Sequence, residues 1–452
     1  MKRWTRLGLA TLALSLSAAQ LASAQTPPKA AHVRFSPRGG MHELVASVIP
    51  YARSTIRIAM YSVSPGQVAM WTPLAAAVAR GVQCLVILNE GNKASNKAKA
   101  AAFAGIGCQV RAISDTMHNK FMTIDGQHTC TGSSNWSKGA EEKYSENRIC
   151  YTSTPTIAAD YDAEFTRLWA KSIEYTKLRG YPRVTAGSGQ FPTQREGIYN
   201  LFTSQNSDTT ALLSQALITA INNARSTLDI AVANYNTQAV ADAVCNAKKR
   251  GVRVRVLTDL GQFSIGTSKV RYLESTACGK VDVRYIAYGL TWVHTFSQLM
   301  HHKLLIADGT HLLTGSYNWS DTAEHANAEN LQWITKSGAT NADLLAAFQA
   351  EFDGLWDLNR TKVPALIAAF TRYTGACHPI HWDTGYLALR IAVTRPELTK
   401  VRSLASASGF FMDRKLSGNR CMVPYLKGVP GSVPRFYPTV PANAVFDAAL
   451  SR

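Results

Sequence analysis

Hydrophobic and polar positions along the chain predict short strands that alternate with amphipathic helices. Residues 68–80 and 238–250 are rich in alanine with helical spacing, and each stretch ends before an Arg-Gly pair, where glycine can stop a helix. The stretches that follow, 83–88 and 253–257, are short and rich in β-branched residues, which predicts strands. This order predicts an α/β fold in which helices cover a largely buried sheet.

The whole pattern occurs twice, which predicts a duplicated domain. Three segments recur: 52–55 as 224–227, 80–82 as 250–252, and 163–169 as 350–356. We therefore predict two pseudo-symmetric halves, residues 31–179 and 198–359, with a functional site at their interface. A linker at 180–197 is rich in Gly, Pro, Ser and Thr. Residues 360–452 lie beyond the repeat and form a C-terminal extension.

One repeated segment keeps its polar residues in register. The first copy holds His118, Lys120, Asp125, Ser133, Asn135 and Glu146, and the second holds His301, Lys303, Asp308, Ser316, Asn318 and Glu329. Because side chains at positions i and i+2 of a strand point the same way, the His-x-Lys spacing predicts a buried strand with both residues on one face. Two such half-sites would place two imidazoles and two ammonium groups around one anion, which predicts cleavage of a phosphodiester.

The N-terminal segment and the net charge indicate the compartment and the partners that we expect for the protein. Residues 1–24 combine a basic start, an apolar run and Ala22-Ser23-Ala24, which predicts a signal peptide and a secreted or periplasmic protein. The net charge is +18, and removal of the three basic residues of that segment leaves +15. Such a charge attracts polyanions, so the expected partners are a phospholipid or membrane surface, or nucleic acid.

The eight cysteines are an even number without Cys-x-x-Cys spacing, which favours disulfides in an oxidising compartment over a zinc or redox motif. Chain position suggests four pairs, although connectivity does not follow from sequence: Cys84–Cys108, Cys130–Cys150, Cys245–Cys278 and Cys377–Cys421.

With His-x-Lys-x4-Asp and Gly-Ser-x-Asn intact in both copies, residues 33–358 resemble the phospholipase D superfamily. The Gly-Ser-x-Asn-Trp-Ser form is most similar to the branch of small bacterial endonucleases and mitochondrial cardiolipin hydrolases, which carry one motif per chain and dimerise. Two motifs in one chain are typical of secreted bacterial phospholipases D, so we expect a monomer.

The chemistry assigns expected roles to the motif residues. One neutral imidazole attacks phosphorus and the other, protonated, supplies the leaving oxygen with a proton. The resemblance implies that His118 is the nucleophile and His301 the acid, whereas the residues alone leave that order open. Lysines, asparagines and serines are expected to offset charge on the phosphate, and Glu146 and Glu329 to orient the imidazoles. Asp125 and Asp308 are expected to be structural. His302 should face away from the site, and no metal or cofactor is required.

Two substrate classes fit these features. The leading hypothesis is hydrolysis of phospholipid headgroups, supported by the fused motifs, the export signal and an insertion before His301 that contains Tyr288, Trp292 and Phe296, as a pocket wall or as a buttress. The alternative is a metal-independent nuclease acting on DNA or RNA, supported by the motif subtype and the charge. A non-catalytic module that binds anions or membranes is disfavoured because both His-Lys pairs survive.

Overall fold

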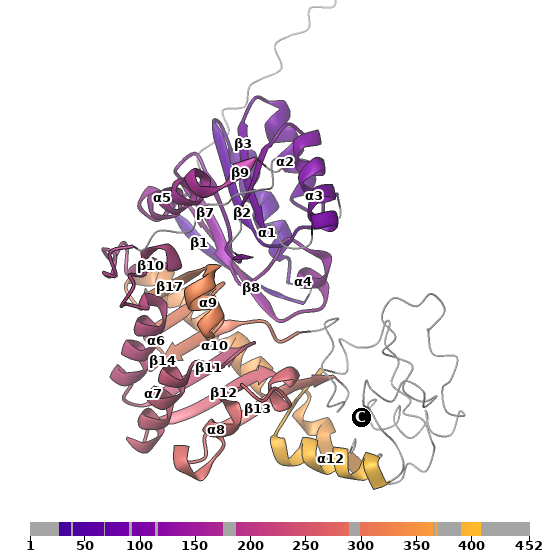
Figure 1. Cartoon of the computed structure of the whole chain (residues 1–452), viewed down its shortest axis with the longest axis vertical. Helices are drawn as coiled ribbons and strands as arrows, with labels where there is room; N and C mark the ends of the chain where they lie inside the picture. The colour runs from indigo at the N-terminus through magenta and orange to yellow at the C-terminus, as the bar shows by residue number, and fades with distance from the viewer. Residues whose placement is uncertain are drawn as a thin grey trace, which may run out of the picture.

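The computed structural model describes residues 27–37, 39–66, 68–89, 93–113, 116–174, 187–288, 299–364, 367–368 and 390–407. Figure 1 shows two α/β bodies stacked along the long axis of the molecule, the N-terminal half above the C-terminal half. Each body contains one eight-stranded mixed sheet flanked by helices, so the predicted fold class is confirmed.

The first half contains a sheet with strand order β1-β8-β7-β6-β2-β3-β4-β9. Its strands are β1 (Ala30–Ser36), β2 (Thr55–Met60), β3 (Gln83–Asn89), β4 (Gln109–Ile113), β6 (Lys120–Ile124), β7 (His128–Gly132), β8 (Glu146–Thr152) and β9 (Ile173–Glu174). Its helices are α1 (Met41–Val48), α2 (Trp71–Ala79), α3 (Lys93–Gly105), α4 (Lys138–Glu142) and α5 (Pro155–Lys171).

The second half repeats this arrangement with strand order β10-β17-β15-β14-β11-β12-β13-β18. Its strands are β10 (Ile198–Phe202), β11 (Thr227–Val232), β12 (Arg253–Asp259), β13 (Asp282–Tyr288), β14 (Lys303–Ala307), β15 (His311–Gly315), β17 (Asn330–Thr335) and β18 (Arg390–Val393). Its helices are α6 (Leu212–Asn223), α7 (Gln238–Lys249), α8 (Val270–Leu273), α9 (Asp321–Ala326) and α10 (Gly338–Trp356).

The two sheets correspond strand for strand, and the last strand shows where the predicted division of the chain needs revision. In the first sheet β9 pairs antiparallel with β4, and in the second β18 pairs antiparallel with β13. Strand β18 and the following helix α12 (Arg395–Ala407) come from the segment predicted to be an extension beyond residue 359. The second sheet therefore recruits its edge strand from that extension.

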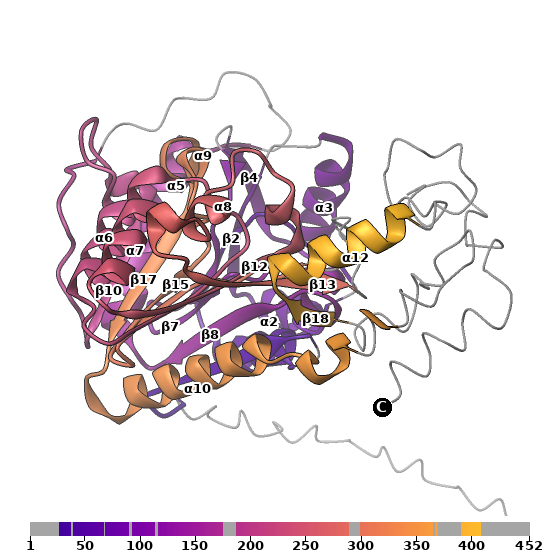
Figure 2. The ribbon, with the colours of Figure 1, turned by 90° about the horizontal axis from the view of Figure 1, so that it is seen from below.

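A hydrophobic core joins the halves. It contains residues of α5, such as Tyr161 and Phe165, together with residues of α10, such as Phe348 and Phe352. The Phe348 ring packs edge-on against Phe35 of β1, with 5.0 Å between centroids. Figure 2 shows α10 running along one side of the molecule, where it meets strands of the first half. Because each half has its own second core as well, the interface is a continuous packed layer between two folded bodies.

Three of the four suggested disulfides are present in the structure: Cys84–Cys108, Cys130–Cys150 and Cys245–Cys278. The fourth pair, Cys377 and Cys421, lies outside the described residues, as do the predicted signal peptide and residues 180–186 of the linker. No helix among the described residues is long and apolar enough to cross a membrane.

Candidate active site

The two motif histidines lie just before their strands, where the backbones of the halves meet. Strands β6 and β14 begin at the lysines, so the expectation that each histidine is part of the strand is revised by two residues. Instead, the N–H of His118 donates to the carbonyl of Ala328, and the N–H of His301 donates to the carbonyl of Ser145. A short parallel pair, β5 (Thr116–Met117) with β16 (Asn327–Ala328), supports the first of these contacts. Each histidine is thus positioned by the opposite half.

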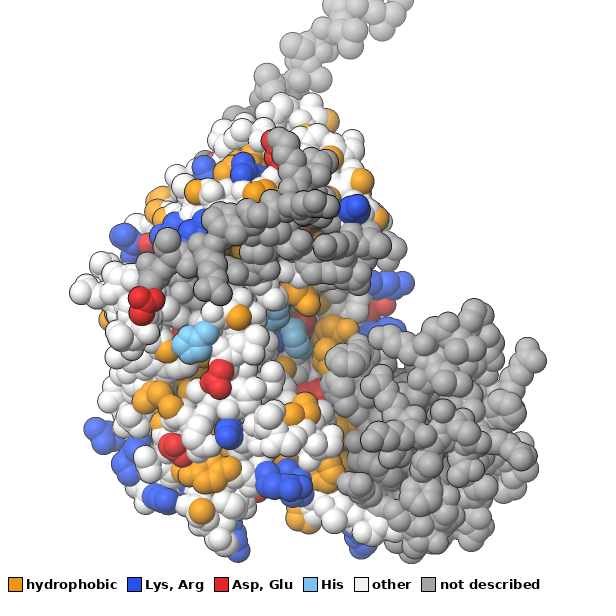
Figure 3. Space-filling view, viewed as in Figure 1, with side chains coloured by type: hydrophobic (Ala, Val, Ile, Leu, Met, Phe, Trp, Pro, Cys, Tyr) orange, Lys and Arg blue, Asp and Glu red, His pale blue; other side chains and the backbone are white. Residues whose placement is uncertain are grey.

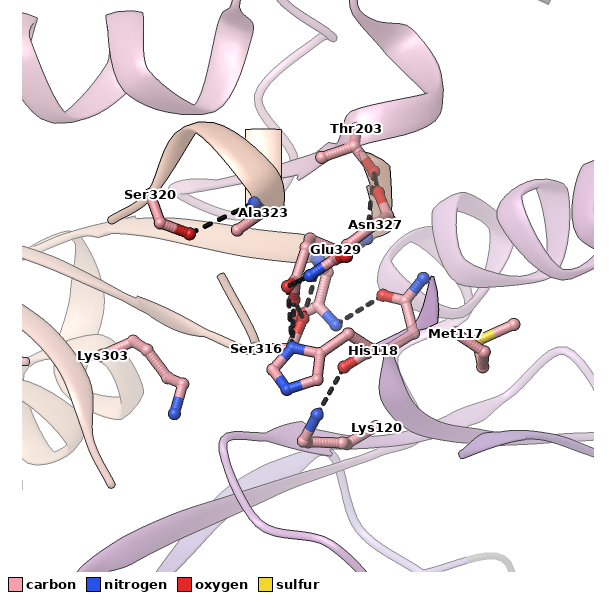
Figure 4. A network of polar contacts seen from close by, with 12 residues as sticks. Met117, His118, Lys120, Thr203, Lys303, Ser316, Ser320, Ala323, Asn327 and Glu329 are labelled. Carbon is pink, nitrogen blue, oxygen red and sulfur yellow. Dashed lines mark hydrogen bonds and ion pairs between the residues drawn. The ribbon is translucent and has the colours of Figure 1, made fainter. Parts of the chain in front are cut away.

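The carboxylates that face the histidines are exchanged between the halves. His118 Nδ1 lies 2.8 Å from Glu329 Oε2, and His301 Nδ1 lies 2.9 Å from Glu146 Oε1. Both glutamates are fully buried. Because an ionised carboxylate only accepts hydrogen bonds, each Nδ1 carries the proton and each Nε2 is left for the substrate. Figure 4 shows the contact of His118 with Glu329 and its neighbours.

The two lysines approach the same region from opposite halves. Lys120 Nζ donates to the carbonyl of His118, and Lys303 Nζ donates to the carbonyl of His301 at 2.7 Å. In Figure 4, Lys303 points from the second half toward His118 and Lys120 of the first. Each ammonium has three N–H donors, so two remain on each lysine for an anion.

Burial sets the protonation states of this cluster. It lowers the pKa of His118 to about 4, although Glu329 opposes the shift. Burial also lowers the pKa of Lys120 to about 7 and that of Lys303 to about 8. For Glu329, burial raises the pKa, but the facing His118 outweighs burial and holds the pKa below its usual value. The free site therefore contains neutral imidazoles, ionised glutamates and lysines that titrate near neutrality.

The motif serines hold the glutamates. Ser316 Oγ donates to Glu329 at 2.6 Å and accepts the N–H of Asn330, while Ser133 Oγ accepts the N–H of Asn147. Both serines are fully buried. Ser316 therefore helps to position Glu329, and Ser133 contacts the residue that follows Glu146. Phosphate binding by the two serines stays a prediction.

The same two segments also contain the motif asparagines and glycines. Asn135 and Asn318 follow the serines by two residues at the ends of β7 and β15, and the side-chain oxygen of each is buried. A Cβ atom at Gly132 would lie 2.4 Å from the carbonyl of Asn147, and one at Gly315 would lie equally close to that of Asn330. Glycine thus allows each loop to approach the strand that carries the glutamate.

Sequence analysis missed a second pair of contacts across the interface. Asn330 Nδ2 donates to Asn119 Oδ1 at 2.8 Å, and Asn147 Nδ2 lies 3.2 Å from His302 Nδ1. His302 faces away from the substrate side, as expected, but its Nε2 also contacts Glu351. It therefore helps to join the halves. The asparagine that follows each motif glutamate was the signal in the sequence.

The motif aspartates lie at the far ends of the strands. Asp125 accepts the N–H groups of Arg53, Ser54 and Thr55, and Asp308 accepts the equivalent three, Arg225, Ser226 and Thr227. Each aspartate ties the end of its strand to the start of the neighbouring strand. Neither belongs to the histidine cluster.

Aromatic rings from the first half flank both histidines. The Tyr61 ring lies edge-on to His118 with 5.1 Å between centroids, and Lys120 Nζ lies 5.2 Å from the same ring. The Tyr144 ring lies beside that of His301, with 6.2 Å between their centroids. Figure 3 shows histidine side chains reaching the surface in the middle of the molecule, with Lys and Arg spread around the periphery. The insertion with Trp292 and Phe296 lies outside the described residues, as does the side chain of Tyr288.

Among the described residues, no group of three or more His, Cys, Asp or Glu is arranged to hold a metal ion. The cations that face the exchanged His–Glu pairs are the lysine side chains.

Comparison with protein families matches both halves. Residues 45–169 and 217–356 match the family described as cardiolipin synthase, PLD-like domain, which covers more than half of the chain. The chain belongs to the phospholipase D superfamily. Its two matched segments contain every motif residue of the exchanged site, so the superfamily pattern is complete in each half.

Individual relatives match shorter stretches. The mitochondrial cardiolipin hydrolase of Chlamydomonas reinhardtii is 33% identical over 138 residues, which are 30% of this chain and 55% of that protein. A phospholipase D of Rickettsia prowazekii is 33% identical over 92 residues, which are 20% of this chain and 40% of that protein. The chain thus spans about half the length of the first of these two relatives and less than half of the second.

A solved structure supports the two-half architecture. The phosphatidylserine synthase of Haemophilus influenzae superposes with a TM-score of 0.54 at 11% identity, covering 71% of this chain and 86% of that one. At this identity the similarity concerns the fold alone.

Proposed function

We propose that the protein is a phospholipase D-type phosphodiesterase that hydrolyses the headgroup phosphodiester of phospholipids through a phosphohistidine intermediate. The observation that carries the proposal is the exchanged pair of contacts, His118 with Glu329 and His301 with Glu146. Two imidazoles with their Nδ1 positions occupied and their Nε2 atoms available form a nucleophile and a proton donor of matched geometry.

In the first step, the Nε2 lone pair of one histidine forms a bond to phosphorus. The bond from phosphorus to the leaving oxygen breaks, and its electron pair stays on that oxygen. The second histidine, which carries a proton on both ring nitrogens once the anionic substrate is bound, transfers its Nε2 proton to that oxygen. Lys120 and Lys303 each have two N–H donors that are not used by their backbone contacts. These donors stabilise the negative charge that builds up on the non-bridging oxygens.

In the second step, a water oxygen forms a bond to phosphorus while the phosphorus–nitrogen bond breaks. The water proton is transferred to Nε2 of the second histidine, which restores its starting state. Glu146 and Glu329 stabilise whichever imidazole carries the positive charge, because each carboxylate lies within 3 Å of a ring nitrogen. The chemistry needs no group beyond the side chains of the cluster and water.

The choice of phospholipid as substrate rests on three supports. The curated relatives include a cardiolipin hydrolase and a phospholipase D. The net charge of +18 favours anionic surfaces. Tyr61, at 37% exposure, is one of few large apolar side chains on the described surface, and it adjoins His118. Cleavage of nucleic acid remains the alternative, since the same charge attracts it.

The three disulfides among the described residues support export to the periplasm or the exterior, because such bonds persist in oxidising compartments. With both half-sites in one chain, a monomer is sufficient for a complete site.

A parallel turnover assay tests this function. The full chain would be incubated in EDTA with vesicles of phosphatidylcholine, phosphatidylglycerol or cardiolipin, and separately with single- and double-stranded DNA. The His118→Ala variant removes one reacting group, and His325→Ala, at an exposed position of α9, is the matched control. Headgroup release that is lost only in the first variant supports the proposal. Cleavage of DNA alone would establish the nuclease alternative instead.

A further inference from the structure

The two half-sites differ in charge although their histidines, lysines and glutamates match. The first difference lies at the ends of the equivalent strands β3 and β12, which finish with Asn89 and Asp259. Asn89 Oδ1 accepts the N–H of Met117, and Asp259 Oδ2 accepts the N–H of Met300, both at 3.0 Å. Each residue therefore holds the segment just before a motif histidine. Only the second half has a carboxylate there.

The second difference is a buried cation. Arg148 occupies the position in β8 that Leu331 occupies in β17, as their pairing with Gly132 and Gly315 shows. Its Nη1 donates to the carbonyl of Lys120 at 2.6 Å, and its Nε donates to Ser134 Oγ. The guanidinium is fully buried, whereas Leu331 is part of the hydrophobic core. Arg148 therefore places a permanent cation next to the backbone of Lys120, where the second half has an apolar side chain.

We propose that Arg148 and Asp259 are positioning residues that make the two ends of the site non-equivalent, favouring neutral His118 as nucleophile and protonated His301 as proton donor. The inference rests on the proposed phosphodiesterase function and deepens it. A cation beside one half-site disfavours a second positive charge there, while a carboxylate beside the other favours one. Both differences thus favour a neutral His118 and a protonated His301.

Effects on the lysines agree with this direction. Burial is the main cause of the lowered pKa of both lysines, but Arg148 lowers the pKa of Lys120 further, and Asp259 raises that of Lys303. The resulting values are about 7 and about 8.

Other charged or titratable groups also face the cluster. From the first half these are Glu141, Tyr144 and Glu146, and from the second Glu329 and Arg390. Glu141 and Glu324 are equivalent residues, and each accepts a backbone N–H from the first turn of a helix in its own half. Their charges therefore do not distinguish the two half-sites. Arg390 donates to Ser145 Oγ, and the carbonyl of Ser145 accepts the N–H of His301, so the charge of Arg390 opposes the effect of Asp259 on that half-site. The Asp259 carboxylate acts on this half-site because it accepts a hydrogen bond from the N–H of Met300, the residue next to His301.

The test exchanges the two strand-end residues. Asp259→Asn, Asn89→Asp and the double variant would be compared with Asp282→Asn, the same chemical change at an exposed position at the start of β13. Each enzyme would react with dibutyroyl phosphatidylcholine, followed by alkaline quenching and peptide mass spectrometry. The measured species is the phosphate adduct on His118 and on His301, which keeps the glycerol part of the substrate because only choline has left. The pH profile of kcat/KM is the second readout.

In the wild type we expect the phosphate on His118. The double exchange is expected to change the labelling ratio of His118 to His301 by about tenfold toward His301, which corresponds to one pKa unit. Asp259→Asn alone should move the basic limb of the pH profile down by about one unit, and Asn89→Asp should move the acidic limb up. Asp282→Asn should alter neither readout.

Arg148 provides an independent arm in case the exchanged variants unfold. Arg148→Lys keeps the cation and should retain His118 labelling, whereas Arg148→Met should increase labelling of His301. Folded variants, verified by thermal melting, that keep both the wild-type ratio and the wild-type pH limbs would overturn the inference. A wild type that turns over substrate without phosphate on either histidine would instead overturn the proposed mechanism itself.

Discussion

His118 and Glu329 are separated by 211 positions in the chain, yet His118 Nδ1 and Glu329 Oε2 lie 2.8 Å apart. The contact fixes the proton on Nδ1 and leaves Nε2 as the ring nitrogen that can meet a substrate. Its counterpart joins His301 to Glu146 in the reverse direction across the same interface.

Replacing this carboxylate by an amide reverses the tautomer. In Glu329→Gln the side-chain NH2 can donate to Nδ1, which moves the imidazole proton to Nε2 and blocks the attack on phosphorus. We expect kcat to fall by about 10²- to 10⁴-fold with little change in melting temperature. Steady-state rates on vesicles measure the effect, and Glu196→Gln, which involves a carboxylate paired with Lys29, is the control. Equal losses in both variants would contradict the positioning role.

The pH profile follows from the buried lysine. Lys120 stabilises the transition state only when protonated, and its pKa is about 7 because burial disfavours the charge. His118 must be neutral to attack, and its pKa is about 4. The profile of kcat/KM should therefore rise near pH 4. Deprotonation of Lys120 should lower it above pH 7, in addition to the fall caused by deprotonation of His301, whose pKa burial holds below its usual value. In Lys120→Arg the guanidinium stays charged, so the basic limb should move to higher pH even if the maximal rate drops. If the basic limb does not move in this variant, a group other than Lys120 causes it.

The motif aspartate should contribute stability rather than catalysis. Hydrogen bonds from three backbone N–H groups outweigh burial and lower the pKa of Asp308 to about 2. Since the folded-state pKa lies below the unfolded value near 4, its contribution is present above pH 4 and is lost as the pH falls toward 2. Asp308→Ala should reduce the free energy of unfolding by about 1 to 2 kcal/mol at pH 7, allowing for partial exposure. Urea titrations at pH 7 and pH 2.5 would show the difference shrinking, with kcat nearly unchanged.

His302 offers a test of the contacts that join the halves. Its counterpart is Asn119, which accepts a hydrogen bond from Asn330. In His302→Asn the equivalent contact with Asn147 becomes an amide pair, so we expect near-normal folding and a loss of activity below about tenfold. His302→Leu leaves the amide of Asn147 buried without this partner and should cost about 1 to 3 kcal/mol. Melting temperatures and rates of the two variants, measured side by side, distinguish a joining role from a passive one.

Much of the fold follows from the sequence because the duplication doubles every signal. Helices were expected at 68–80 and 238–250, and α2 and α7 lie there, while the strands after them extend only slightly further than expected. The α/β class was confirmed for the same reason. The edge strand β18 was missed because it comes from residues beyond the part of the sequence that repeats, although β9 is its structural counterpart in the first sheet.

The spacing of polar residues in the sequence pointed to the residues of the candidate site, but not to the contacts between them. The spacing identified both the histidines and the glutamates, yet local patterns carry no information about which glutamate meets which histidine. That exchange depends on the docking of two surfaces that are far apart in the chain. Arg148 and Asp259 escaped notice for a different reason: each breaks the repeat, whereas the search was for residues that the repeat preserves.

The exchanged carboxylates also determine when the molecule becomes competent during its synthesis. A ribosome that has completed the first half at residue 179 has made His118, Lys120 and Glu146, but Glu329, the partner of His118, is still 150 residues away. Until the second half is present, His118 therefore has no carboxylate beside its Nδ1. A complete site forms only when the second half docks on the first, so we expect hydrolysis of a diester to depend on assembly of the two halves.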